Sequence, residues 1–354
     1  MAKSSQEKSK TTSSDKDQTD VAALKQKRIL TGADIVAIGE EAELLVGGKN
    51  YNTAIISQIA GIKAPQFRAV SSIGFHVLLD EAKINASLTR AVVDREYKRI
   101  DWEDPEISGD PEFLQKFVRN LGKAVQAEYE AKGGGQGQVR LRTFVNNVVE
   151  GFATSPEGID QLRRRSVLVQ AAILSVPLPE SIAEAVRGAY EDICAEAGDD
   201  LVPVAVRSSA AGEDSRKKAF AGLQDTYLNI AGAEAVVKAY HWDCASAYNL
   251  RSMTYRREAI LDAVAAAERT GDDSIAENAK IEWAIENTSL SVCIMRMINP
   301  VISGTAFAAD TATGCRGTSR NDLVSIDASY GLGEAVVGGM VTPDKLFVFQ
   351  RDDG

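Results

Sequence analysis

Short apolar segments separated by helical patterns place the strongest constraint on the fold of this chain. Residues 202–206 (VPVAV) form an apolar run of strand length. Three further strand candidates follow at residues 291–298, 323–326 and 346–349, with helical periodicity before them at 240–266. A helical bundle or an all-β sandwich would not mix the two patterns in this way. The sequence therefore predicts an α/β or α+β fold.

Charge and composition argue against several classes of function. The 354 residues carry a formal net charge of −10, which disfavours binding to nucleic acid or to an anionic membrane surface. No apolar run approaches the roughly 20 residues of a membrane span, and the N-terminus lacks an apolar signal sequence. The four cysteines are widely spaced without a CxxC pair, so neither zinc nor a disulfide framework is indicated. We expect a cytoplasmic protein.

The chain has only two histidines, His76 and His241. Both lie in helical patterns with apolar neighbours, which favours structural roles for them. A Ser/His/Asp triad or a site with several histidine ligands would be hard to build from this inventory.

Two regions show no clear site. Residues 1–20 are almost all polar, and the sequence predicts a disordered tail over residues 1–28. Residues 85–165 are charged and are expected to be rich in loops. Their glycine run at 132–137 (KGGGQG) lacks the spacing of a phosphate loop, so we interpret it as a linker. The three arginines at 163–165 are interpreted as a solvated face.

Four segments combine glycine, charge and strand ends in ways that suit phosphate. GGKN (47–50) precedes a helical pattern, where glycines let a ligand approach the backbone and Lys49 adds charge near helix amides. VAVRSSAAGED (204–214) puts Arg207 at the end of a strand, where a guanidinium can clamp phosphate oxygens. The other two are FAGLQDTYLNI (220–230) and DASYGLGE (327–334). Together they predict a phosphate-binding α/β protein.

In their order, these segments resemble the N-terminal nucleotide-binding part of phosphoenolpyruvate synthase and pyruvate phosphate dikinase, an ATP-grasp module. That family has a GGKN-type start, then AVRSSA..ED and FAGQ.(D/E)T.LN motifs. Its later motifs include a helix ending in (S/T)YR, QRMV followed by SG..F..D, and GLGE.vV.G.v.PD. Counterparts here lie at residues 244–256, 295–314 and 329–344. The resemblance covers residues 30–349 apart from 85–165.

The resemblance implies an ATP-grasp-type module of two lobes. The first lobe would comprise residues 29–235, with an inserted charged region at about 85–165. The second would comprise residues 236–354 and would be truncated relative to the family, which would leave the module incomplete at its C-terminus.

The resemblance also implies the residues of the site. Lys49 and Arg207 would bind the phosphates of ATP, and Arg207 would be the catalytic residue. The other expected nucleotide-binding residues are Gly48, Ser208, Gly222 and Thr226, the last two in a flap over the nucleotide. ATP would bind with Mg²⁺, with Mn²⁺ or K⁺ as alternatives, and no metal ligand can be assigned.

Two departures from the family pattern bear on function. Met295 replaces the glutamine that precedes Arg-Met-Val, and the family's acidic metal ligands and phosphohistidine would follow Gly354. We therefore interpret the chain as the ATP-binding subunit of a split dikinase, inactive alone, that passes a phosphoryl group to a histidine on a partner subunit. The alternatives are the ATP-binding subunit of another split phosphotransferase of this type and a noncatalytic nucleotide-sensing subunit.

Overall fold

The computed structural model describes residues 21–133, 137–152, 158–210, 225–282, 284, 288–309 and 323–349. The expected tail at 1–20 and the expected site residue Gly222 lie outside these residues, whereas residues 21–28 lie within them. The chain divides into two compact units, Met1–Arg296 and Met297–Gly354. Each unit contains a β-sheet whose strands all belong to that unit.

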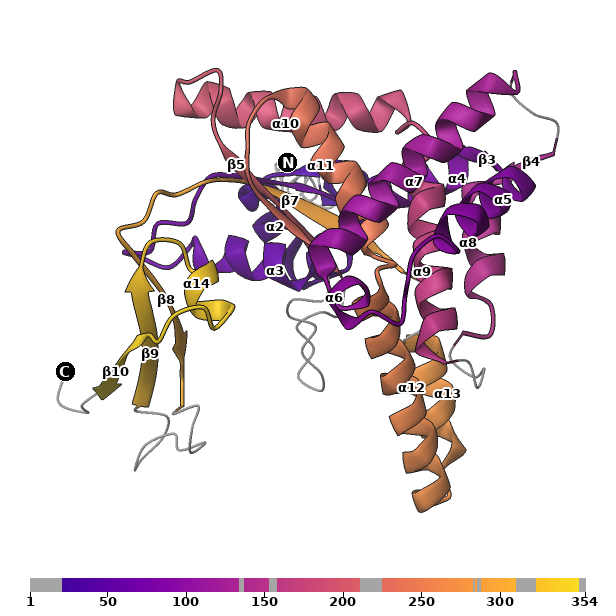
Figure 1. Ribbon diagram of the computed structural model, residues 1–354. Helices are drawn as coiled ribbons and strands as arrows, with labels where there is room; N and C mark the ends of the chain where they lie inside the picture. Colours follow the sequence, from indigo (N-terminus) through magenta and orange to yellow (C-terminus); the bar gives the residue numbers. More distant parts are fainter. Residues whose placement is uncertain are drawn as a thin grey trace, which may run out of the picture. The chain divides into compact units, whose positions relative to one another are not determined.

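An antiparallel sheet of five strands forms the centre of the first unit, in the order β1-β2-β7-β5-β6 (Figure 1). Its strands are β1 (Ile29–Leu30), β2 (Phe67–Val70), β5 (Val204–Ala210), β6 (Thr226–Ile230) and β7 (Leu290–Arg296). The predicted strand at 202–206 is β5, which begins at Val204 and continues through Arg207. It continues because β7 and β6 pair with it on its two sides. The mixed α/β class is confirmed, and the sheets are antiparallel.

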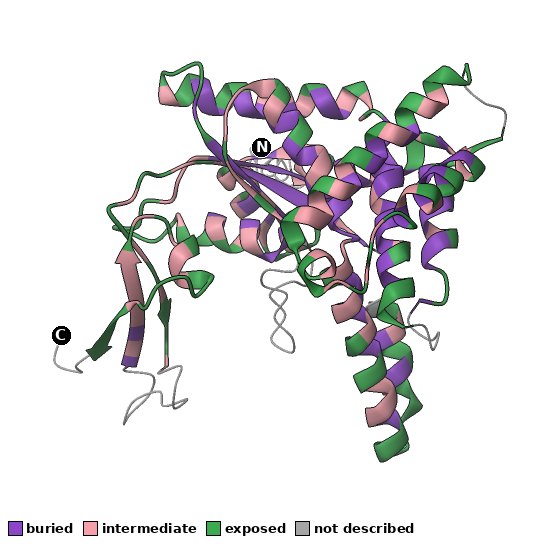
Figure 2. Cartoon of the chain, in the orientation of Figure 1, coloured by how far each residue is buried: buried purple, intermediate pink, exposed green. Residues whose placement is uncertain are grey.

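Helices cover both faces of this sheet (Figure 1). One face carries α2 and α3, which pack around Ala69 and Cys293. The other carries α4, α10 and α11, which pack around Val70, Val206 and Val292. The bounds are α2 (Gly32–Ile38), η1 (Gly39–Glu41), α3 (Ala42–Ile56), α4 (Ser72–Glu81), α10 (Glu180–Ala197) and α11 (Ala233–Ser246). Figure 2 shows the sheet as buried between the two layers.

The region at 85–165, expected to be rich in loops, is largely helical. Two of its elements, β3 and α9, extend beyond these bounds. The elements are β3 (Lys83–Asn85), α5 (Ala86–Tyr97), α6 (Pro105–Ser108), α7 (Pro111–Ala131), β4 (Gln138–Arg140), α8 (Leu141–Val149) and α9 (Ile159–Leu174). The charged residues occupy exposed helix faces, while Val118, Leu121 and Val125 form a buried stripe on α7. Arg163 is also buried, against Trp102, so the arginine run is not uniformly solvated.

Helices α12 (Leu250–Thr270) and α13 (Asp273–Glu282) complete the described part of the first unit. The helical pattern predicted at 240–266 is confirmed, and the structure divides it between α11 and α12. Asn249 caps α12 by accepting a hydrogen bond from the Ser252 amide at 2.8 Å. None of the described helices is long and apolar enough to cross a membrane.

The second unit has a three-stranded antiparallel sheet in the order β10-β9-β8. Its elements are β8 (Ile302–Phe307), β9 (Leu323–Tyr330), α14 (Glu334–Val337) and β10 (Asp344–Phe349). The predicted division between lobes at residue 235 differs from this compact unit, which begins at Met297. Residues 236–296 belong to the first unit because β7 pairs with β2 and β5 there.

Candidate nucleotide-phosphate site

The GGKN segment lies at a kink within α3. Gly47 has φ 73° and ψ 163°, so the helix is interrupted there and resumes at Gly48. A Cβ atom at Gly47 would lie only 2.3 Å from the Ser209 carbonyl oxygen and 2.4 Å from its hydroxyl oxygen. Only glycine tolerates both the left-handed backbone and this close approach. The kink therefore presses the new helix N-terminus against β5.

A buried network of hydrogen bonds fixes this contact. The Asn50 amide donates to the Ser209 hydroxyl at 3.3 Å, so a serine on β5 caps the resumed helix. The Asn50 side chain donates to the Val46 carbonyl at 2.9 Å and to the Ser291 hydroxyl at 3.2 Å. Ser291 in turn donates to the Val70 carbonyl at 2.7 Å. The glycine segment is thereby tied to three strands, β5, β7 and β2.

The expected phosphate clamp, Arg207, lies on the same face of the sheet as this contact. Arg207 pairs in register with Thr226 on β6 and with Cys293 on β7, and directly opposed residues project to one face. Cys293 packs with the apolar residues of α2 and α3, which identifies the face. Burial raises the pKa of the Cys293 thiol to about 12, although the nearby Arg207 charge opposes this shift. The Cys293 thiol is therefore uncharged and lies beside the Arg207 guanidinium.

The structure brings most of the predicted residues together but separates Ser208 from them. Lys49 lies in the first turn of the resumed helix, and Gly48 beside it is buried. Ser208 is buried and alternates with Arg207, so it projects to the opposite face of β5. Ser209, which the sequence did not single out, is the serine that contacts the glycine segment.

Backbone amides at a helix N-terminus, a lysine in its first turn and an arginine on the adjoining strand form a suitable set of donors for an anion with several oxygens. Met295 lies on the same face, in register with Ala205, and packs against the cluster around α2 and α3. No group of three or more His, Cys, Asp or Glu side chains that could hold a metal ion occurs within the described ranges.

Comparison with known proteins identifies the family of the chain. The family described as pyruvate phosphate dikinase, AMP/ATP-binding domain, matches residues 43–354. The chain belongs to this family. The matched range spans residues 85–165.

The relatives are phosphotransferases of this family. The chain is 29% identical over 304 residues to a probable phosphoenolpyruvate synthase of Pyrococcus abyssi, which covers 86% of the chain and 30% of the relative. It is 34% identical over 212 residues to the phosphoenolpyruvate synthase of Aquifex aeolicus, covering 59% and 21%. It is 35% identical over 303 residues to a rifampicin phosphotransferase of Streptomyces, covering 86% and 24%. The chain thus spans less than a third of the length of these curated relatives.

Both histidines lie across the sheet from Arg207, in helices that pack on the other face. His76 on α4 accepts a hydrogen bond from Arg142 at Nδ1 (3.2 Å), because a guanidinium can only donate. Its Nε2 therefore carries the proton and donates to the Ser289 hydroxyl at 3.3 Å. Burial and the Arg142 charge lower the pKa of His76, with Asp80 opposing them. The predicted structural role is consistent with these contacts.

His241 on α11 donates through Nε2 to the Ile173 carbonyl at 3.0 Å, and burial lowers the pKa of His241 to about 4. The unfolded chain, with a pKa near 6.5, therefore binds more protons than the folded chain between pH 4 and 6.5. We expect the free energy of unfolding to be unaffected by this group above pH 6.5 and to fall by about 2–3 kcal/mol as the pH is lowered to 4.

Urea titrations across this pH range would measure the effect, with His241→Gln as the comparison because glutamine can also donate to Ile173. The variant should lose stability less steeply between pH 6.5 and 4. Parallel pH profiles for the two proteins would contradict the assignment.

Proposed function

We propose that this chain is the ATP-binding subunit of a split dikinase of the phenylphosphate synthase type. That reaction converts phenol, ATP and water to phenylphosphate, AMP and phosphate in anaerobic phenol degradation. The observation that supports the proposal is the close approach of Gly47 to Ser209, which joins α3, where Gly48 and Lys49 lie, to β5, where Arg207 lies. Phenol itself would bind to another subunit.

In this proposal the chain binds and orients ATP. Arg207 is the catalytic residue, because its guanidinium would contact phosphate oxygens from a rigid strand and stabilise the charge that develops during transfer. Lys49 and the amides beside Gly48 would hold the same phosphates. Thr226, exposed at the start of β6 next to Arg207, and Gly222 would belong to the flap.

Mg²⁺ would accompany the nucleotide, with Mn²⁺ or K⁺ as alternatives. Magnesium is usually held by one or two carboxylates together with substrate phosphates, so a dedicated cluster of protein ligands is not needed. When bound, the ion would neutralise phosphate charge. The residues described here supply the positive charge on the protein side.

The phosphoryl acceptor is proposed to be a histidine on a partner polypeptide. A nucleophile must lie in line with the transferred phosphorus and within contact distance. His76 and His241 belong to helices on the opposite face of the sheet from Arg207, and the Nδ1 lone pair of His76 accepts from Arg142. Neither can attack a phosphate held at Arg207 without crossing the sheet.

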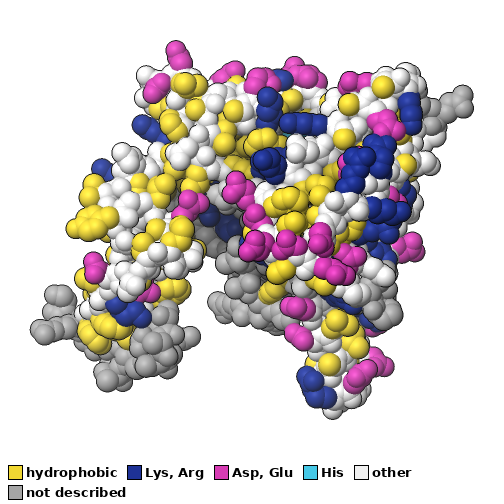
Figure 3. All heavy atoms as spheres, viewed as in Figure 1, with side chains coloured by type: hydrophobic (Ala, Val, Ile, Leu, Met, Phe, Trp, Pro, Cys, Tyr) yellow, Lys and Arg dark blue, Asp and Glu magenta, His cyan; other side chains and the backbone are white. Residues whose placement is uncertain are grey.

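The second unit offers a surface on which the partner could dock. All six residues of β10 are exposed, and Figure 3 shows hydrophobic side chains on the surface of this unit. Phe349 is 63% exposed on β10, and Val337 is 74% exposed on α14, next to Gly333 and Glu334. Exposed apolar patches of this kind mark protein contacts. We therefore propose docking near residues 333–349.

One alternative has its own support. The 35% identity to a rifampicin phosphotransferase fits the ATP-binding part of another phosphotransferase of this family. A noncatalytic subunit that senses nucleotide is the other alternative. The genes next to this one, or the proteins that copurify with it, would separate the three.

The direct test uses ATP labelled at the β-phosphate. The purified chain is incubated with labelled ATP and Mg²⁺, with and without the neighbouring subunit, and the proteins are separated under alkaline conditions that preserve phosphohistidine. We expect label on the partner only. Stable label on this chain alone would overturn the split arrangement, while ATP binding without any transfer to a copurifying protein would favour the nucleotide-sensing alternative.

A further inference from the structure

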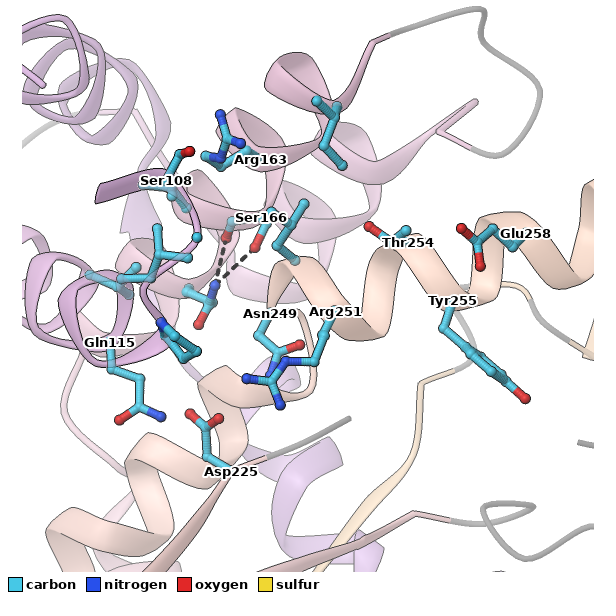
Figure 4. Close-up of a pocket in the computed structure, with 18 residues that line it drawn as sticks. Ser108, Gln115, Arg163, Ser166, Asp225, Asn249, Arg251, Thr254, Tyr255 and Glu258 are labelled. Atoms are coloured by element: carbon cyan, nitrogen blue, oxygen red, sulfur yellow. Dashed lines mark hydrogen bonds between the residues drawn. The ribbon is translucent and has the colours of Figure 1, made fainter. Parts of the chain in front are cut away.

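A cavity of about 450 Å³ lies in the first unit among α6, α7, α9 and α12 (Figure 4). Its volume falls within the range of small-molecule binding sites. Most of its wall comes from the helical region at 85–165 and the rest of α9, for which the proposed function provides no role. The remaining wall comes from the start of α12 and from Asp225.

This cavity is not part of the candidate phosphate site, because it lies on the other face of the sheet. Asp225 immediately precedes Thr226, and successive residues of an extended chain project in opposite directions. The Tyr227 hydroxyl donates to Asp225 Oδ2 at 3.2 Å, and the Tyr227 ring packs on Trp242 of α11 at 5.4 Å. Arg119 of α7 lies over the same tryptophan. Asp225 therefore belongs to the face covered by α7 and α11.

Polar side chains gather at one end of the cavity. Gln115, Asp225, Asn249 and Arg251 point toward one another there (Figure 4). Burial raises the pKa of Asp225, while hydrogen bonds from Tyr227 and Gln115 and the Arg251 charge act against this. A carboxylate has lone pairs for about four hydrogen bonds, so it can accept from a ligand donor as well.

The middle of the cavity is apolar. Leu114 and Val118 of α7 form one side, and Val167 of α9 and Leu250 of α12 form the others. These side chains suit an aliphatic or aromatic body, whose transfer from water is favourable.

The charges that line the cavity are balanced. Two arginines, Arg163 and Arg251, face two acids, Asp225 and Glu258. Arg163 is also paired with Asp160 at 3.2 Å. A polyanion such as a second nucleotide would therefore find no surplus of positive charge. The apolar middle of the cavity favours a neutral occupant over a cation, because burying a charge is costly.

We propose that this cavity is a second ligand site, separate from the nucleotide, for a neutral small molecule with an apolar ring-sized body and a hydroxyl group that donates to Asp225. Ligand binding at Asp225 would also affect the start of β6, because Asp225 and the proposed flap residue Thr226 are neighbours in the chain. The proposal does not depend on the identity of the phosphoryl acceptor.

The test compares two aromatic probes that differ in one donor. Binding of 2-naphthol, which is neutral at pH 7, and of 2-methoxynaphthalene, which has no donor, is measured on the full chain by saturation-transfer NMR. We expect saturable binding of 2-naphthol with a dissociation constant of about 0.1–1 mM. The Asp225→Asn substitution should raise the dissociation constant of 2-naphthol about three- to tenfold. It should change the dissociation constant of 2-methoxynaphthalene less than twofold.

Two variants that fill the cavity with a large side chain test whether 2-naphthol binds there. Thr254→Trp projects a large ring into the cavity from α12, and Ser108→Trp does so from α6, which keeps the test valid if one variant fails to fold. Either variant should lower the affinity for 2-naphthol at least tenfold. The matched control is Leu261→Trp, also on α12, where the native side chain is 46% exposed and does not line the cavity. It should bind as the native chain does.

Three outcomes would overturn the proposal. The first is the absence of saturable 2-naphthol binding to the native chain. The second is unchanged binding in folded Thr254→Trp and Ser108→Trp chains, which would put the probe elsewhere. The third is an equal effect of Asp225→Asn on both probes, which would remove the hydroxyl contact.

Discussion

ATP binding is expected to weaken by about 10- to 100-fold when Arg207 or Lys49 is replaced by alanine. A hydrogen bond to a charged group contributes about 1.5–3 kcal/mol, and each substitution removes at least one such contact with phosphate in the proposed site. Arg207 is held by pairing on both sides of β5, so its removal leaves the sheet intact. Calorimetric titration with Mg-ATP and the activity of the assembled enzyme would both report the loss.

Two exposed cations provide matched controls for these variants. Arg164 on α9 pairs with Asp94 at 2.7 Å, and Lys132 after α7 pairs with Glu128 at 3.0 Å. Exposed pairs of this kind contribute little to stability, and neither lies on the face of Arg207. Arg164→Ala and Lys132→Ala should bind ATP as the native chain does. Native affinity and activity in both Arg207→Ala and Lys49→Ala would remove these residues from the site.

Gly47→Ala is expected to lower the free energy of unfolding by about 3 kcal/mol. A left-handed backbone costs an alanine roughly 1–2 kcal/mol, and forcing a methyl group into packed atoms costs about 1–3 kcal/mol more. The new Cβ would lie 2.3 Å from the Ser209 carbonyl oxygen, which belongs to a paired strand and cannot retreat easily. Denaturation in urea would measure the change, and ATP affinity should fall with it because α3 is displaced from β5.

A Gly39→Ala variant separates the cost of the left-handed backbone from the cost of the close contact with Ser209. Gly39 also has a positive φ, 78°, but nothing lies within 4 Å of the position its Cβ would take. This variant should therefore lose only about 1–2 kcal/mol, the cost of the backbone alone, and should keep its affinity for ATP. Equal losses at the two glycines would show that the contact with Ser209 is unimportant.

The local motifs could be predicted from the sequence, but the face on which each side chain lies could not. The strand candidates and the GGKN segment rest on neighbouring residues, and the structure has strands at the predicted places. Ser209, not Ser208, shares the face of Arg207, and the sequence does not reveal this because both faces of β5 are covered. A strand covered on both faces has no solvent-exposed polar side. Its sequence therefore does not indicate which side chains point to which face.

The helical region at 85–165 was misjudged for a different reason. Its many charged residues suggested loops, whereas the decisive signal was the spacing of Val118, Leu121 and Val125 along one side of α7. The division at Arg296 depends on long-range pairing. Nothing near β7 in the sequence indicates that it pairs with β2, so the extent of the first unit could not be inferred locally.

The strand order has a consequence for how the protein is made. β7 lies in the middle of the five-stranded sheet, between β2 and β5, although it is the last of the five to be synthesised. Until Arg296 has left the ribosome, the paired strands β1 and β2 cannot join β5 and β6, and each pair keeps an apolar edge without a neighbour. Long-range pairing of this kind folds slowly and leaves such edges open to aggregation. The nascent chain therefore keeps these edges open until β7 has emerged, and the face of the sheet that carries Arg207 is completed only after that point.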